Sequence, residues 1–593
     1  MSPSRRAVLR GALAGAGGGV LRSLGFRLAA GGTALGLGAA ATEHASGAGE
    51  VFATRLRMPP VLTDPHVTLV AKEALVQLAP GAPTRMWTFN GAFPGPVIRR
   101  PSGTPTRVTV KHRLPASVGT LTIHHHGAHA APSEDGQPER NVIAPGKERT
   151  YTYGLREDGT PERAAFQWYH DHSHYRTTRN VWHGLAGLYI VDDAFDAKLP
   201  LPKGAYDVPL MVTERTLDGS NQLTDPFVVY TDKQPITSPG VGTGYAPNDD
   251  LFGSRFLVNG VERPFLEVAP RKYRFRILNT SPFRPYNFRL SNGAAMVQIA
   301  TESGLMPKPV SRTEILLGPA ERAEVVIDFA PLRGRSITLD TVEVSGKGPL
   351  PATAPGLAKL MEFRVTKPAS RETAKVPAAL RPLPAWVAKA STQPHRVWVF
   401  GVGADAQARA AWTINGRAFD HTRVDAHPEL GSTETWLLVN ASPNAVSHYI
   451  HIHDVDWKVL QRNGQAPAPG EDALKETFRL DPGEVLLVAG KFSDHLGHYM
   501  LHCHMLQHED HGMMTSFEVV KPGAGDGGLP GLEPALERSI ADPVVRDQVR
   551  ALVAAAKGGR PAPASLLPTP ADVAQASLVE LLSRGGPGYV CTP

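Results

Sequence analysis

The stretch Trp87–Arg100, "WTFNGAFPGPVIRR", is a β-rich run that turns at an Asn-Gly pair and then continues. Asn-Gly between apolar runs is the strongest short-range signal for a two-residue hairpin turn. The same arrangement returns as "SRFLVNGVERPFLEV" from Ser254 and as "AWTINGRAFD" from Ala411. Recurrence at a long period indicates that the chain repeats one structural unit three times.

A second element follows each turn in the same order. It reads "IAPGKERTYTYGL" from Ile143, "LGPAERAEVVIDF" from Leu317 and "LDPGEVLLVAGKF" from Leu480. Each is a turn followed by an alternating apolar strand. The 58 glycines and 53 prolines among 593 residues also favour turns and short strands. We therefore predict an all-β protein of three Greek-key β-sandwich domains at 51–195, 205–367 and 390–521.

Past Lys521 the repeated pattern stops, and residues 522–593 form a C-terminal extension that opens with a Gly/Pro linker. Two short amphipathic helices are expected, near Pro543–Lys557 and Ala571–Ser583. A structural appendage is favoured over a partner-docking segment. The only reactive group in it is the thiol of Cys591.

Residues 1–41 contain five arginines and no acidic residue. The run "SRRAVLR" from Ser4 resembles a twin-arginine export signal, with a small-residue cleavage site near Ala39–Ala41. We expect an exported, periplasmic or extracellular protein; a disordered tail is the alternative. Arg22 and Arg27 interrupt the apolar stretch, so no membrane span is predicted. Without this leader the formal charge falls from +6 to +1, which gives no sign of a nucleic-acid partner.

The stretch His498–Met514, "HYMLHCHMLQHEDHGMM", places Cys503 between two histidines. On a strand, residues i and i+2 share a face while i+1 points the other way. His502 and His504 are therefore expected on one side and the thiol on the other, so that one strand feeds two metal centres. A thiolate with imidazoles and a weak axial thioether is typical of blue-copper electron-transfer sites.

Three more clusters hold histidines at i, i+2 spacing: "TIHHHGAHAA", "WYHDHSHY" and "SHYIHIHDVDW". A single pair of this kind is a weak signal, but four clusters are hard to reach by chance. A structural zinc site needs only four ligands, which disfavours a zinc-binding protein. The paired positions are His124 and His126, His170 and His172, and His451 and His453, with His448 three residues earlier.

The order HxHG, HxH, HxxHxH and HCHxxxHxxxxM resembles the four copper signatures of the multicopper oxidases. The likeness covers about residues 51–520 and includes "FNGAFPGPVIR" and "PAERAEVVIDF". The phrases "HIHDVDWKVL" and "HEDHGMM" are similar to those of bilirubin oxidases and spore-coat laccases. The resemblance implies three cupredoxin domains, the second without copper ligands, and four copper ions per chain.

The resemblance also assigns ligands. Gly127 after the third histidine selects the 124/126 register, which leaves His125 for packing, and Trp168-Tyr169 favours 170/172 over 172/174. The implied type 1 ligands are His448, Cys503, His508 and axial Met513. The implied type 2 ligands are His124 and His451. The implied ligands of the type 3 pair are His126, His170, His172, His453, His502 and His504.

The activity implied is one-electron oxidation of a phenolic, aromatic or metal-ion donor coupled to four-electron reduction of O2 to water. Asp135 and Glu509 resemble the family's acids beside the copper cluster and are expected to relay protons; ordinary loop carboxylates are the alternative. An oxidase of Cu(I) or Mn(II), and a copper-free export or cell-division scaffold, are the competing functions. The expected partners are O2 and a small reductant, with the chain a monomer.

Overall fold

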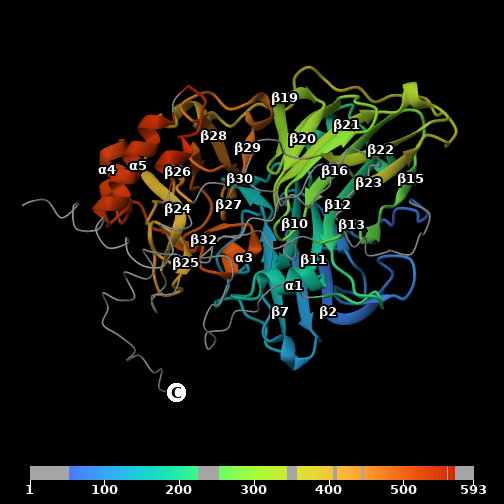
Figure 1. Cartoon of the computed structure of the whole chain (residues 1–593), viewed down its shortest axis with the longest axis horizontal. Coiled ribbons are helices and arrows are strands. Elements are labelled where there is room, and N and C mark those ends of the chain that lie inside the picture. The colour runs from blue at the N-terminus through green and yellow to red at the C-terminus, as the bar shows by residue number, and fades with distance from the viewer. Residues whose placement is uncertain are drawn as a thin grey trace, which may run out of the picture. The chain divides into compact units, whose positions relative to one another are not determined.

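The computed structural model describes residues 52–224, 253–342, 357–404, 410–442, 446–556 and 558–567. The predicted export signal lies outside these residues. Within them, six main sheets form three pairs in chain order, called here the first, second and third sandwich (Figure 1). A separate two-stranded ribbon joins β8 (Arg156–Glu157) and β9 (Thr160–Pro161). The predicted all-β class is confirmed.

The first sandwich closes around a core that includes Leu69, Val110 and Tyr151 from one sheet and Ile98 and Tyr189 from the other. One sheet has the order β1 (Val61–Leu62), β4 (Gly95–Pro101), β11 (Ala186–Asp192), β10 (Ala165–Asp171), β6 (Ile123–His126). The other has the order β3 (Thr84–Phe89), β2 (His66–Val76), β5 (Thr106–His112), β7 (Glu148–Tyr153).

The second sandwich packs Phe275 and Val325 of its larger sheet against Phe288, Leu339 and Phe363 of the smaller one. The larger sheet has the order β14 (Val261–Glu262), β13 (Arg255–Val258), β12 (Asp207–Arg215), β16 (Lys272–Asn279), β21 (Arg322–Asp328), β18 (Met296–Thr301), β19 (Gly304–Arg312). The smaller has the order β15 (Phe265–Glu267), β23 (Leu357–Arg364), β22 (Ser336–Val342), β17 (Tyr286–Leu290), β20 (Glu314–Leu317).

The third sandwich has a core rich in tryptophan, with Trp398, Trp436 and Trp457 facing Phe478 and Phe517. Its larger sheet has the order β25 (Ala410–Ile414), β24 (Arg396–Ala404), β26 (Thr433–Asn440), β31 (Val485–Lys491), β28 (Trp457–Arg462), β29 (Leu474–Lys475). Its smaller sheet has the order β30 (Thr477–Leu480), β27 (His448–Ile452), β32 (Gly497–Cys503), β33 (Met514–Val519).

The three Asn-Gly turns share one geometry. The asparagines have φ of 58°, 48° and 52°, and the glycines after them have φ of 80°, 71° and 75°. Positive φ at both central residues is the type I′ conformation that hairpins favour. Each asparagine also accepts a backbone N–H and donates to a carbonyl two residues earlier, as Asn90 does with Val70 and Thr68. Asn259 and Asn415 repeat both bonds.

The C-terminal extension packs on the third sandwich through two helices (Figure 1). Helix α5 (Pro543–Ala555) confirms the first predicted helix, whereas the second falls outside the described residues. Helix α4 (Leu532–Ser539) was not predicted. Its Pro534 lies in the first turn, where proline is tolerated. Among the described residues, no helix has the length and apolar character needed to cross a membrane.

Strand pairing brings the histidine clusters together. In the first sandwich β10 runs antiparallel to β6, so that His170 lies opposite His124. In the third, β27 runs antiparallel to β32, so that His451 lies opposite His502. Two short helices follow these strands, α1 (Thr177–His183) and α3 (Leu506–Asp510). The Asp510 carboxylate joins them by accepting the first two backbone N–H groups of α1.

Candidate metal centre

The thiol of Cys503 lies in a buried group with two imidazoles. Its Sγ is 3.5 Å from His448 Nδ1 and 3.6 Å from His508 Nδ1, and those two nitrogens are 3.2 Å apart. Two nitrogens that share one metal ion at about 2.0 Å lie about 3.3 Å apart. The Ser442 hydroxyl lies 2.7 Å from His448 Nε2, which leaves Nδ1 for a metal ion.

Met513 lies beside this group and is fully buried. Its backbone N–H donates to the carbonyl of His508, and its own carbonyl accepts from the backbone N–H of Cys503. These bonds hold the backbone of Met513 next to Cys503 and His508. Its side chain packs in the same core as Cys503.

Burial sets the protonation of this group. It raises the pKa of the Cys503 thiol to about 12 and lowers the pKa of His448 to about 3. Without a metal ion both groups are therefore neutral at physiological pH. A metal ion that binds the sulfur must displace the thiol proton, which couples metal affinity to pH.

The other eight predicted histidine ligands form a second buried cluster. His124 and His451 face each other through their Nε2 atoms at 3.4 Å. His502 Nε2 lies 3.3 Å from His172 Nε2 and 3.2 Å from His453 Nε2. Three sets in the cluster have ligand atoms that lie within 4.8 Å of one another, as a shared ion requires. They are His124, His126 and His451; His126, His170 and His504; and His172, His453 and His502.

Most of these imidazoles use their other nitrogen to contact a protein acceptor. His170 Nδ1 donates to the carbonyl of Asp171 at 2.8 Å, and His451 Nδ1 to the carbonyl of Glu476 at 3.0 Å. His124 Nδ1 donates to the carbonyl of Asp135 at 2.6 Å. Such bonds fix the tautomer and leave the inner nitrogen as a metal ligand. The donor set, neutral imidazoles with one thiol, suits copper.

Asp135 and Glu509 each contact two imidazoles of the cluster. Asp135 Oδ2 accepts from His453 Nδ1 at 2.9 Å, and its Oδ1 lies 3.4 Å from His124 Nδ1. Glu509 contacts His502 Nδ1 at 3.0 Å and His172 Nδ1 at 3.4 Å. Burial opposes ionisation, but the adjacent imidazoles outweigh it and lower the pKa of both carboxyl groups. These groups are buried carboxylates, not ordinary loop residues.

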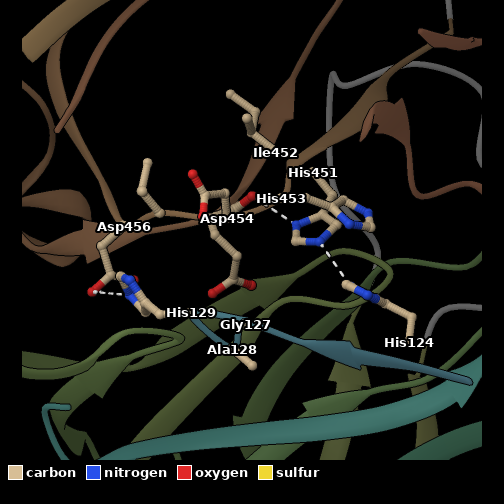
Figure 2. A pocket seen from close by; sticks show the side chains of 11 residues that line it. His124, Gly127, Ala128, His129, His451, Ile452, His453, Asp454 and Asp456 are labelled. Carbon is tan, nitrogen blue, oxygen red and sulfur yellow. Dashed lines mark hydrogen bonds and ion pairs between the residues drawn. The ribbon is translucent and has the colours of Figure 1, made fainter. Parts of the chain in front are cut away.

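A small cavity opens beside His124, His451 and His453 (Figure 2). Its volume of about 10 Å³ is near the space that one water molecule needs. In the view of Figure 2, Asp454 lies between these histidines and the His129–Asp456 pair. A second pocket of about 230 Å³ shares His129 and Asp456 and is also lined by Glu157, Arg163 and Lys491. Polar side chains therefore extend outward from the cluster.

The remaining histidines near the site have other surroundings. His125 packs against Tyr189 and Tyr153, as the 124/126 register predicted. His174 Nδ1 lies 2.6 Å from Glu139 Oε1. The histidine sets contain His170 and His172, so the structure agrees with the 170/172 register and not with 172/174. His129 is buried and bridges Asp494 and Asp456, which raise its pKa although burial lowers it. His511 is buried, while His498 is partly exposed.

Sequence reasoning missed several groups that contact the predicted ligands, among them Ser442, Asp171, Glu476 and Thr477, whose hydroxyl lies 3.2 Å from His126 Nε2. Ser442 and the carbonyl of Asp171 carry no sequence signal, because any residue offers a carbonyl and serine is common in loops. Glu476 Oε1 lies 3.1 Å from His126 Nε2. In the sequence Glu476 is a single acidic residue between two strands of the third unit. Such residues are common on protein surfaces, so the sequence does not mark it as part of a site.

The sequence and the fold are both similar to those of known proteins. A family model described as "Multicopper oxidase" matches residues 391–523, and another of the same description matches residues 71–195. A laccase of Bacillus subtilis (strain 168) is 34% identical over 481 residues, covering 74% of this chain and 91% of the relative. The bilirubin oxidase of Albifimbria verrucaria is 32% identical over 448 residues, covering 73% of this chain and 72% of the relative.

Among solved structures, the laccase from Pediococcus acidilactici Pa5930 superimposes with a TM-score of 0.65 at 28% identity. The match covers 79% of this chain and 94% of that one. The two segments matched by the family models together contain all the predicted ligands. Residues 71–195 contain the histidines from 124 to 172, and residues 391–523 contain the ligands from 448 to 513.

Proposed function

This chain belongs to the multicopper oxidase family, and from that premise we propose which residues hold the copper, which move protons and what donor is oxidised. The protein is an oxidase that couples oxidation of a substrate to reduction of O2 and uses type 1, type 2 and type 3 copper. The proposed domains are the three sandwiches, with bounds at 51–195, 205–367 and 390–521, followed by the extension at 522–593.

The observation that carries the proposal is that one three-residue run, residues 502–504, supplies a side chain to three separate groups of candidate ligands. Cys503 lies with His448 and His508, while His502 and His504 lie in separate histidine sets. We assign the first group, with Met513 as axial ligand, to type 1 copper, and the His124–His451 pair to type 2 copper. The six remaining histidines are assigned to the type 3 pair: His126, His170 and His504 to one ion, and His172, His453 and His502 to the other.

Copper bound at these sites supplies the one-electron steps that add up to the four-electron reduction of O2. The chain provides the path between them, because peptide bonds join Cys503 to His502 and His504. It also shields these ligands from bulk water, since all three side chains are buried.

Asp135 and Glu509 are proposed to deliver the protons that O2 reduction consumes. Both are buried carboxylates next to imidazoles of the cluster, so each can pass a proton from a neighbouring water to the reaction site. Asp135 contacts His124 and His453, and Glu509 contacts His172 and His502. Both acids therefore reach the set of His172, His453 and His502, and Asp135 also reaches His124.

We propose a phenolic or aromatic donor, because the relatives reported above are named laccase and bilirubin oxidase. Oxidation of Cu(I) or Mn(II) is the second candidate. Met361 is the only methionine in residues 350–450, which offers little of the thioether-rich surface that would favour Cu(I). In a kcat/KM panel over phenols, aromatic amines, bilirubin, Mn(II) and Cu(I), an organic donor should rank first. A metal ion at the top would overturn this choice.

Export by the twin-arginine route is proposed from Ser4, Arg5 and Arg6. Replacing both arginines with lysine keeps the charge but removes the paired guanidinium groups. The variant should remain in the cytoplasm while the wild-type chain is recovered outside it. Cell fractionation followed by immunoblotting measures this, and equal export of both proteins would contradict the proposal.

A further inference from the structure

Gly127, which follows the predicted ligand His126, has φ of 87° and lies against a guanidinium group. A Cβ at this position would lie 2.6 Å from Arg322 Nη2 and 3.3 Å from Glu476 Oε2. No side chain fits there unless both groups move. The glycine of the first copper signature therefore makes room for an ion pair, in addition to allowing a left-handed turn.

Arg322 begins β21 of the second sandwich, which contributes none of the proposed copper ligands. Its side chain is fully buried, and its guanidinium forms a two-bond pair with Glu476, with Nη2 to Oε2 at 3.1 Å and a short contact from Nη1 to Oε1. Its Nε donates to the carbonyl of Phe166 at 2.8 Å, on the strand that carries His170. The planar fork of arginine fixes both carboxylate oxygens, which a lysine cannot do.

Glu476, held in this way, contacts two proposed ligands of different copper types. Its Oε1 accepts from His126 Nε2 at 3.1 Å, and its backbone carbonyl accepts from His451 Nδ1 at 3.0 Å. The two imidazole rings stack with centroids 3.7 Å apart and planes within 16°. Glu476, a residue of the third sandwich, thus orients His126 of the first sandwich and His451 of β27 in the third.

The bond to Glu476 determines which nitrogen of His126 can bind metal. With Nε2–H donating to the carboxylate, Nδ1 is the nitrogen left, and it has no hydrogen-bond partner among the described residues. In His124 and His451 the arrangement is reversed, since Nδ1 contacts a carbonyl and the Nε2 atoms face each other. His126 is therefore oriented by side chains, the Glu476 carboxylate and the Thr477 hydroxyl 3.2 Å from its Nε2, whereas backbone carbonyls orient His124 and His451.

We infer that Arg322 is a positioning residue for the copper cluster, acting through Glu476 to fix the orientation and tautomer of His126 and to secure His451. The inference rests on the proposed ligand assignment. It gives the second sandwich an indirect part in the metal site, through Glu476, and explains the arginine of the "PAERAEVVIDF" phrase. Loss of a group that orients a metal ligand typically weakens metal binding by roughly 10- to 100-fold.

The test uses copper-loaded full-length protein and two substitutions. Arg322→Met removes the charge and the fork, and Arg322→Lys keeps the charge alone. Both variants should lose cluster copper at a chelator concentration roughly 10- to 100-fold lower than wild type, with the smaller shift for lysine. The type 2 signal in electron paramagnetic resonance should change, because Glu476 also contacts His451. The blue absorption of the Cys503 site should remain.

Arg396→Met is the matched control. Arg396 is equally buried and makes the same two-bond pair with Glu434, at 2.7 and 3.0 Å, but this pair lies beside Trp436 and Asp526 instead of the histidines. It should lower the melting temperature without changing the chelator titration or the type 2 signal. If Arg322→Met does not fold, the lysine variant decides the question.

Wild-type resistance to chelator in both Arg322 variants, with an unchanged type 2 signal, would overturn the inference. An equal shift in the Arg396 control would overturn it too, because the effect would then be general loss of stability. If wild-type protein itself lacks type 2 and type 3 copper while it retains the blue site, the cluster assignment fails instead. The two failures are therefore distinguishable.

Discussion

Cys503→Ser is expected to give a colourless protein whose turnover with any donor is several orders of magnitude below wild type. The sulfur lies 3.5–3.6 Å from two buried imidazole nitrogens, and the same residue links His502 to His504. Serine is nearly the same size, so the third-sandwich core should still pack. Its hydroxyl is a much harder ligand and does not support the thiolate-to-copper charge transfer that gives the blue colour.

The visible spectrum and the rate of O2 uptake at saturating donor measure this effect. Cys591→Ser, at the only other cysteine of the chain, should change neither quantity. A Cys503→Ser protein that stays blue, or that consumes O2 near the wild-type rate, would refute the assignment of this thiol to the electron-accepting copper.

Asp135→Asn should lower kcat by about 10²- to 10⁴-fold while the protein keeps its full copper content and blue colour. An asparagine oxygen can still accept from His453 Nδ1, and His124 donates to the backbone carbonyl at position 135, which the substitution does not alter. The amide cannot take up and release a proton. The loss should be greatest at high pH, where water supplies few protons to replace the relay.

The measurement is kcat between acidic and alkaline pH together with copper per chain. Asp207→Asn is the control, since Asp207 is also buried but pairs with Arg276 of the second sandwich. It should leave kcat and its pH profile unchanged. If Asp135→Asn loses copper, the residue is needed to hold the site; if kcat is unaffected, it does not relay protons.

The sequence predicts well what is local and periodic. The Asn-Gly pairs specify type I′ turns whatever surrounds them, so Asn90, Asn259 and Asn415 could be placed at once. The alternation of a strand likewise separates Cys503 from its neighbours, and the structure places its sulfur with His448 and His508 while His502 and His504 face other histidines. The paired histidines could be found because their i, i+2 spacing alone places both side chains on one face of a strand.

Contacts between distant residues could not be predicted in the same way. His126 and Glu476 are 350 positions apart and come from different sandwiches, and Arg322 comes from a third. No local pattern encodes how the sandwiches pack against one another. Helix α4 was missed for a related reason, because its apolar side is specified by the sheet that it covers: Ala535 and Leu536 pack against Val397 and Leu437.

Copper per chain, measured in wild type and Cys503→Ser alongside electron paramagnetic resonance, tests the account most directly. Wild type should hold four copper ions and show both a type 1 and a type 2 signal. The variant should hold three, with the type 1 signal gone and the type 2 signal intact, because His124 and His451 are unchanged. A wild-type protein with fewer than four copper ions and no type 1 signal, or a variant that keeps that signal, would contradict the account.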